Sequence, residues 1–298
     1  MSDSAATLRS RAEGLSGALP PLLVAATNLA NSALPGAHGR RRAGQGAEFW
    51  QFRLAVGSDG AGRIDWRRSA RGDDHFVRET EWQAARSVAL WVDDGAAMGF
   101  ASGKQAETKG QRARLLAMAL GVLLLRGGER VGLARPDMPP RAGQAQAARL
   151  AMTLDAPEGA EEHTLPVLTT LPAGGHAVLF SDFLGDPEPV EAALAEAAAR
   201  QIGGLLVQVL DPAEEGFPFD GRTRFESMSG HLHYETLRAG DLRSAYLQRL
   251  AARKDRLDQM ARHAGWRFTT LHTDAAPAAG LMWLWQAIAT GPGARQGA

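Results

Sequence analysis

The feature that most constrains the fold is an alternation of short apolar runs with long helical patterns, which begins near residue 85. Five runs have the length and apolar content of buried strands: 87–92, 130–134, 177–180, 205–210 and 267–271. Helical patterns lie at 104–126, 143–152, 187–201, 241–264 and 278–289. Because strands joined through helices lie parallel, the sequence predicts an α/β fold with a doubly wound, mainly parallel sheet.

The residues before this alternation predict a separate N-terminal extension. Residues 1–35 are rich in Ala and Leu, as in helices, and residues 36–82 are rich in Gly and Arg with short β-like pieces. We therefore expect an extension of helix and β structure over residues 1–84 and an α/β domain over residues 85–298. No run of about 18 apolar residues occurs, so we expect no membrane span.

Composition excludes several classes of function. The 298-residue chain has no cysteine, which excludes disulfides, thiolate nucleophiles and cysteine-bound metals and favours a cytoplasmic location. The 33 basic and 33 acidic residues cancel, so net charge does not favour nucleic acid or membrane binding. Residues 38–80 contain nine Arg, but six acids interleaved with them favour internal ion pairs over a nucleic-acid patch.

Acidic residues follow two of the predicted strands. Asp93 and Asp94 come after the first strand, and Asp182 follows a later one. The carboxyl ends of parallel strands share one edge, where such sheets bind ligands. Like charges a few ångströms apart repel by about 1–4 kcal/mol, so the acids need a cation, an arginine or a proton between them. We therefore identify Asp93, Asp94 and Asp182 as candidate binding residues.

Four interpretations of this acidic edge are open. The interval between Asp93 and Asp182 is long for a phosphorylated receiver domain, and Gly95 stands where a phosphatase with an aspartate nucleophile carries its second acid. The other two are a divalent-ion site and acids that cap helices or pair with arginine. The sequence has no Walker A, Gly-x-Ser-x-Gly or His-Glu-x-x-His pattern, so ATPase, serine hydrolase and zinc protease functions lack support.

Two further features have a structural and a functional interpretation. His231 and His233 lie in a predicted hairpin at 222–237, near a turn at Ser229-Gly230, and share a strand face. We interpret them as an exposed face, with a two-histidine metal site as the alternative. The charged helix at 241–264 is interpreted as a solvated face over a core stripe, and its alternative is a partner-docking helix.

The segment between residues 44 and 81 resembles the signature of the domain of unknown function 58 (DUF58) family. The resemblance rests on Gly44-Gln-Gly46-Ala-Glu48-Phe49, Arg53, Gly57-Ser-Asp59, Arg63-Ile-Asp65-Trp66-Arg67-Arg68-Ser69-Ala70-Arg71, Val77-Arg78-Glu79 and Glu81. Its signature residues are Glu48, Arg53, Asp65, Trp66, Arg67, Ser69 and Arg71. The strand into Asp93 and the Ser181-Asp182 ending also match.

The resemblance implies a fold like that of von Willebrand factor type A domains and a metal-ion-dependent adhesion motif, Asp-x-Ser-x-Ser. Asp93 matches the leading acid and Asp182 the distal one, but Gly95 and Ala97 replace the two serines. Thr169 and Thr170 lie in a segment that does not align with the remaining ligand position. Mg²⁺ needs near-octahedral oxygen coordination, so we expect a degenerate site and no cofactor.

The resemblance also implies a partner, because such proteins accompany MoxR-type AAA+ ATPases. We therefore expect a non-catalytic protein-binding or adaptor module that is accessory to such an ATPase. The alternative is a metal-dependent protein-ligand module that still binds Mg²⁺ through Asp93 and Asp182. A hydrolase that uses these acids is the least favoured class.

Overall fold

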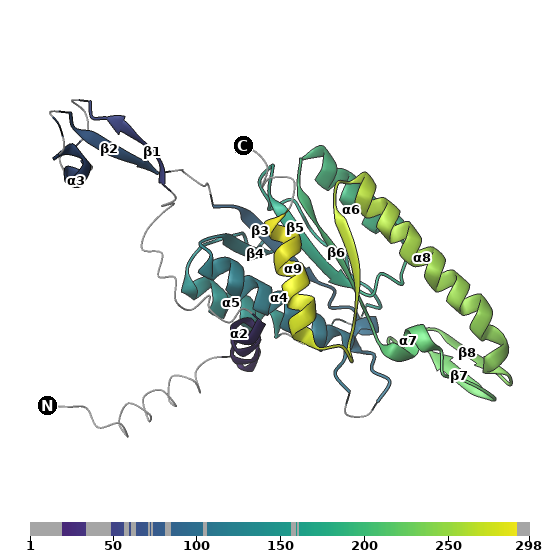
Figure 1. Ribbon diagram of the computed structural model, residues 1–298. Helices are drawn as coiled ribbons and strands as arrows, with labels where there is room; N and C mark the ends of the chain where they lie inside the picture. Colours follow the sequence, from purple (N-terminus) through teal and green to yellow (C-terminus); the bar gives the residue numbers. More distant parts are fainter. Residues whose placement is uncertain are drawn as a thin grey trace, which may run out of the picture. The chain divides into compact units, whose positions relative to one another are not determined.

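The computed structural model describes residues 20–33, 49–56, 60, 64–70, 72, 74–80, 85–103, 106–155, 159 and 161–290 (Figure 1). The chain forms two compact units, and each is described by itself. The larger comprises residues 1–35 and 86–298, and the smaller comprises residues 36–85. The predicted extension, 1–84, differs from this division, since the N-terminal helix is grouped with the larger unit.

The larger unit is built on a parallel sheet of five strands in the order β4-β3-β5-β6-β9. The strands are β3 (Ser87–Val92), β4 (Arg130–Leu133), β5 (His176–Ser181), β6 (Gly203–Leu210) and β9 (Arg267–His272). Every neighbouring pair is parallel. The predicted α/β fold with a mainly parallel sheet is thus confirmed. Because β3 and β5 are neighbours, their carboxyl ends meet at one edge of the sheet.

Helices cover both faces of this sheet (Figure 1). One face packs against α4 (Lys109–Arg126), α5 (Gln144–Leu154) and α9 (Pro277–Ala289), and the other packs against α6 (Glu188–Ala199) and α8 (Arg243–His263). Helix α2 (Pro21–Ala33) packs on the outside of α4 and α9. Val88 and Leu90 of β3 enter the first core, whereas Ala89 and Trp91 enter the second. Alternate side chains of a strand point to opposite faces, so a strand buried on both is apolar throughout.

Helix α4 starts later than the sequence pattern suggests. Thr108 caps it, because its hydroxyl accepts a hydrogen bond from the backbone N–H of Gln111, whose side chain accepts one from the backbone N–H of Thr108 in return. The helix therefore begins at Lys109, and Gly127 is its C-terminal cap. This capping box places Lys109 in the first turn, next to the edge where β3 and β5 end.

A small hairpin and short helices lie near the same edge. They are η2 (Ala96–Gly99), α7 (Pro212–Gly216), β7 (Thr223–Glu226), β8 (His233–Thr236) and η3 (Ala239–Leu242). Strands β7 and β8 pair antiparallel, as predicted for 222–237. The hairpin turns through Gly230, whose φ of 76° suits a residue without a Cβ.

All seven signature residues fall within the smaller unit, residues 36–85. Antiparallel strands β1 (Phe49–Leu54) and β2 (Phe76–Thr80) accompany the short helix α3 (Trp66–Ser69). Asp65 caps α3 by accepting a hydrogen bond from the Arg68 N–H at 3.1 Å. The buried Ser69 hydroxyl accepts one from the Phe76 N–H at 2.9 Å and so ties α3 to β2. Trp66 and Arg67 are exposed, Arg53 lies in β1, and Glu48 and Arg71 lie outside the described residues.

Candidate functional site

Asp93 and Asp182 meet at the carboxyl edge of the sheet. They directly follow the neighbouring strands β3 and β5, and each is 1% exposed. Asp94 is exposed, and its backbone N–H donates to the Thr164 hydroxyl at 3.3 Å. The structure thus brings together two of the three predicted acids at one edge.

The Asp93 carboxylate accepts four hydrogen bonds from within the chain. Its Oδ1 accepts from the Gly95 N–H at 2.9 Å and from both the N–H and the hydroxyl of Thr164, at 3.0 and 2.9 Å. Its Oδ2 accepts from the Ser181 hydroxyl at 2.7 Å. In the sequence, neither Thr169 nor Thr170 aligns with this edge. The threonine that contacts Asp93 is Thr164, which lies in a segment without a helical or strand pattern.

A serine side chain does not fit at position 95, where the adhesion motif has its first serine and this chain has glycine. A Cβ at this position would lie 2.4 Å from the Glu162 carbonyl oxygen and 2.7 Å from the His163 Cα. The Ala96 N–H donates to the Glu161 carbonyl at 2.7 Å and the Ala97 N–H to the Glu162 carbonyl at 3.1 Å. The segment 161–164 therefore packs directly on the turn after β3 and leaves no room for a side chain there.

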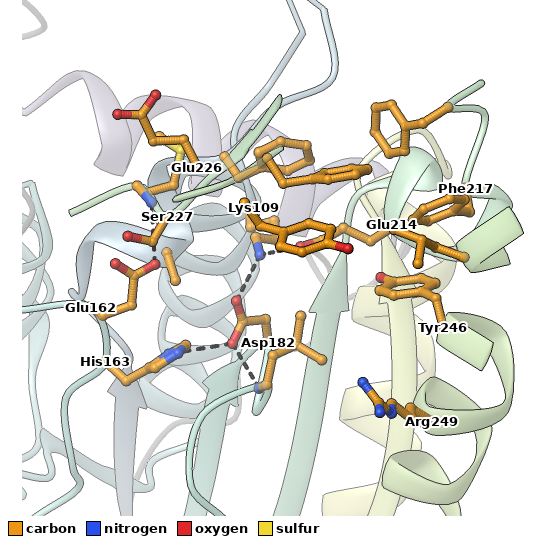
Figure 2. A pocket seen from close by; sticks show the side chains of 18 of the residues that line it. Lys109, Glu162, His163, Asp182, Glu214, Phe217, Glu226, Ser227, Tyr246 and Arg249 are labelled. Atoms are coloured by element: carbon orange, nitrogen blue, oxygen red, sulfur yellow. Dashed lines mark hydrogen bonds and ion pairs between the residues drawn. The ribbon is translucent and has the colours of Figure 1, made fainter. Parts of the chain in front are cut away.

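Lys109 supplies the positive charge that the acidic edge requires. It is 1% exposed, and its Nζ lies 2.7 Å from Asp182 Oδ2 and 2.7 Å from Glu214 Oε1 (Figure 2). A cation at a helix N-terminus opposes the helix dipole, so these two carboxylates must stabilise it. Sequence reasoning missed both Lys109 and Glu214. The available signal was a lysine directly after a capping threonine in a helix that is otherwise largely apolar.

The ionisation of this group follows from its burial and charges. Burial lowers the pKa of Lys109, but the attraction of Asp182 and Glu214 outweighs it, so the pKa rises and the ammonium stays charged. Burial, followed by the charges of Glu214 and Asp182, raises the pKa of Tyr246 to about 12. Burial also raises the pKa of Glu214, and the positive charge of Lys109 offsets this only in part.

His163 lies between the two acids. Its Nδ1 is 3.6 Å from Asp182 Oδ1 and 3.9 Å from Asp93 Oδ2. Asp93, His163 and Asp182 each offer a ligand atom within 4.8 Å of the others, the one such group of three in the described part of the chain. The donors do not fit Mg²⁺, because hydrogen bonds occupy Asp93, the Lys109 ammonium occupies Asp182, and the third donor is an imidazole.

A pocket of about 730 Å³ opens above Lys109. Lys109, Asp182 and Glu214 lie at its base, and the hairpin β7–β8 and helix α8 contribute to its walls (Figure 2). Six of the lining side chains are aromatic: Phe100, Phe217, Phe219, Phe225, Tyr234 and Tyr246. Phe217 contacts Tyr246 with ring centroids 4.9 Å apart and stacks on Phe225 at 5.8 Å. Most of the wall therefore comes from residues that follow Asp182 in the chain.

Glu162 ties the tip of the hairpin to the loop beside Asp93. Its carboxylate accepts hydrogen bonds from the N–H groups of Ser229, at 2.9 Å, and Met228, at 3.3 Å. Burial raises the pKa of Glu162, but the hydrogen bonds from Ser229 and Met228 outweigh it, so the pKa is lowered. The tether is therefore stronger when the carboxylate is ionised.

The tether should weaken in acid. A lowered folded-state pKa means that the stabilisation is complete above the unfolded-state pKa and is lost as the pH falls through the folded-state pKa. We expect the Met228 and Ser229 amide resonances to shift in a nuclear magnetic resonance titration over this acid range. Glu162→Gln should abolish this pH dependence, whereas Glu161→Gln on the same loop should retain it. If the Met228 and Ser229 resonances of Glu162→Gln shift with pH as they do in the parent protein, the tether is contradicted.

The other predicted residues lie apart from this edge or play structural roles. His231 and His233 are exposed on the hairpin. Helix α8 buries a stripe of Leu250, Leu257, Met260 and Ala261. Among the described helices, none is both long enough and apolar enough to cross a bilayer.

A five-stranded parallel sheet whose buried acidic edge pairs with an internal lysine defines the class of this α/β protein. The chain belongs to the family described as "Protein of unknown function DUF58", which matches residues 52–256. The resemblance inferred from the signature residues is thereby confirmed.

Curated relatives extend the similarity over most of the chain. The uncharacterized proteins Rv1480 of Mycobacterium tuberculosis and Mb1516 of Mycobacterium bovis are each 27% identical over 276 residues, which cover 87% of this chain and 85% of theirs. The solved structure of the conserved hypothetical protein BatB from Bacteroides thetaiotaomicron aligns at 13% identity with a TM-score of 0.40, over 70% of this chain and 100% of that chain. An aerotolerance-related membrane protein from Bacteroides fragilis aligns at 14% identity with a TM-score of 0.38, over 68% and 98%.

Proposed function

We propose that this protein is a non-catalytic protein-binding module that acts in the cytoplasm as an accessory of a MoxR-type AAA+ ATPase and needs no divalent ion. The observation that carries this proposal is the buried Lys109, which lies 2.7 Å from both Asp182 and Glu214. A fixed ammonium provides the charge that a metal ion would otherwise supply. This contact supports an edge that works without a cofactor.

The same contacts weigh against an enzyme that uses these acids. A nucleophile or general base needs an oxygen that can reach substrate. Both oxygens of Asp93 accept hydrogen bonds from within the chain, and Asp182 is equally buried and held by Lys109 and the Leu184 N–H. Membership of the DUF58 family supports the ATPase partner through the association that the resemblance implies. Since the sequence has no Walker A motif, ATP hydrolysis would belong to that partner.

The test is capture of the partner by the immobilised full-length chain. We expect a MoxR-type ATPase, identified by mass spectrometry, to be retained from native extract in the presence or absence of ATP. The interaction should persist between the two purified proteins in nucleotide-free buffer containing EDTA. If no ATPase is recovered either with or without ATP, the proposed partner is wrong. If the purified proteins interact in buffer without EDTA but not in buffer with EDTA, the interaction depends on a metal ion.

The alternative is a module that binds Mg²⁺ through Asp93 and Asp182. One observation favours it: Asp93 and Asp182 follow neighbouring parallel strands, so their carboxylates meet at one edge. Titration calorimetry with Mg²⁺ separates the two functions. We expect binding that is millimolar or absent and that Asp93→Ala leaves unchanged. Binding tighter than millimolar that Asp93→Ala abolishes would favour the metal-dependent module.

A further inference from the structure

The base of the 730 Å³ pocket has an excess of negative charge. Lys109 contacts two of the carboxylates there, Asp182 and Glu214. Glu162, Glu226 and Arg249 also line the pocket, so four acids face two bases and the lining has a formal charge of −2. The Glu214 side chain is 14% exposed, which leaves part of it accessible from the pocket. The raised pKa of Tyr246, caused first by burial and then by these carboxylates, agrees with a negative potential inside the pocket.

The walls suit a cation that has an apolar stem. Six aromatic side chains line the pocket, and the face of an aromatic ring attracts cations within about 6 Å of its centroid. The Lys109 ammonium already lies 5.6 Å from the centroid of the Phe100 ring. A guanidinium can stack on aromatic rings and also donate two parallel hydrogen bonds to one carboxylate. Aromatic walls above an acidic base therefore favour arginine.

The mouth of the pocket continues onto exposed apolar residues of the hairpin. Met228 and Tyr234 line the pocket and are nevertheless exposed, and Leu232 is 73% exposed. Leu232 lies two residues before Tyr234, and side chains with this spacing in an extended chain share a face. A small cation would contact the pocket alone, whereas apolar residues at its mouth favour a longer ligand with apolar side chains.

We propose that the pocket and the hairpin bind a segment of a protein partner that inserts an arginine side chain between apolar neighbours. The guanidinium would lie among the aromatic rings and face Glu214, and the neighbours would contact Leu232 and Met228. This inference rests on the proposed protein-binding function and adds the chemistry of the recognised segment.

The test uses pools of fluorescein-labelled hexapeptides in which one position is fixed and the others are mixtures of apolar residues and glycine. The fixed residue is arginine, lysine, citrulline or glutamate; citrulline has nearly the shape of arginine but no charge. In fluorescence polarisation with the full-length chain, we expect the arginine pool to bind at least about fivefold more tightly than the citrulline and glutamate pools. Equal binding of the arginine and citrulline pools, or no binding of any pool, would overturn the inference.

Matched variants place the binding in the pocket. Glu214→Gln removes the excess charge at the base and should weaken arginine-pool binding by about fivefold or more. Glu215→Gln is the control, because the neighbouring Glu215 pairs with Lys254 and His272 and does not line the pocket. Circular dichroism should confirm that both variants fold. Equal effects of the two variants on binding would refute this location.

A second comparison separates a peptide segment from a small cation. Leu232→Ser should weaken binding of the arginine pool and leave millimolar binding of N-acetyl-arginine amide unchanged. If the free amide binds as tightly as the pool, the occupant is a small molecule and the inference fails. The peptide result is independent of the ATPase capture, so failure of that capture would remove the named partner without affecting the recognition of arginine.

Discussion

Replacement of Lys109 by methionine should lower the free energy of unfolding by about 3–5 kcal/mol, the usual cost of removing one partner from a buried ion pair. Methionine keeps much of the aliphatic volume, so the loss should come mainly from charge. Asp182 and Glu214 would remain, without the ammonium that now lies 2.7 Å from each. Urea denaturation followed by circular dichroism measures the change.

The effect should depend on pH with a defined sign. Burial raises the pKa of Glu214 even with Lys109 beside it, and removal of the ammonium would raise that pKa further. Groups with raised folded-state pKa values favour the folded state at low pH and lose that contribution as the pH rises. The destabilisation of Lys109→Met should therefore be larger at pH 8 than at pH 5.

Lys254→Met is the matched control. Lys254 pairs with Glu215, but its side chain is 25% exposed, and accessible ion pairs contribute about 1 kcal/mol or less. Similar losses in the two variants would show that the charge of Lys109 has no special role at the edge.

Replacement of Gly95 by serine should destabilise the protein without creating a metal site. Gly95 has φ −65° and ψ 155°, which any residue adopts, so the cost arises from space alone. The new Cβ would meet the Glu162 carbonyl oxygen at 2.4 Å and displace the segment that includes Thr164, which holds Asp93. Overpacking of this kind costs about 1–3 kcal/mol. Unfolding measurements and calorimetry with Mg²⁺ test both expectations.

Ala97→Ser is the comparison, since Ala97 occupies the position of the second serine in the adhesion motif. The addition of one hydroxyl to an existing side chain should cost less than the creation of a side chain at Gly95. We expect neither variant, nor the double variant, to bind Mg²⁺ more tightly than millimolar. If the double variant binds Mg²⁺ tightly and is as stable as the parent protein, then the two missing serines are the sole reason why the parent protein lacks a metal site.

The sequence predicts the architecture of the larger unit well, because burial on both faces of a sheet imposes a local pattern. Strands such as β5 and β6 are apolar along nearly their whole length, and this alone separates them from the amphipathic helices. The edge between Asp93 and Asp182 follows from the same pattern, since parallel strands present their carboxyl ends together. The boundary of the N-terminal extension was harder to predict, because α2 packs against a helix about 90 residues later in the chain.

The sequence by itself determined the parallel sheet, the DUF58 signature and the two acids at one edge. Only the tertiary structure decided what balances those acids and what lies above them. Lys109, the adjacent pair His163 and Thr164, and Glu214 come from three separate segments, and no periodicity links them. The reason is physical: a strand or helix is specified by its near neighbours in sequence, whereas a buried charge is compensated by whichever groups the fold brings within about 3 Å of it.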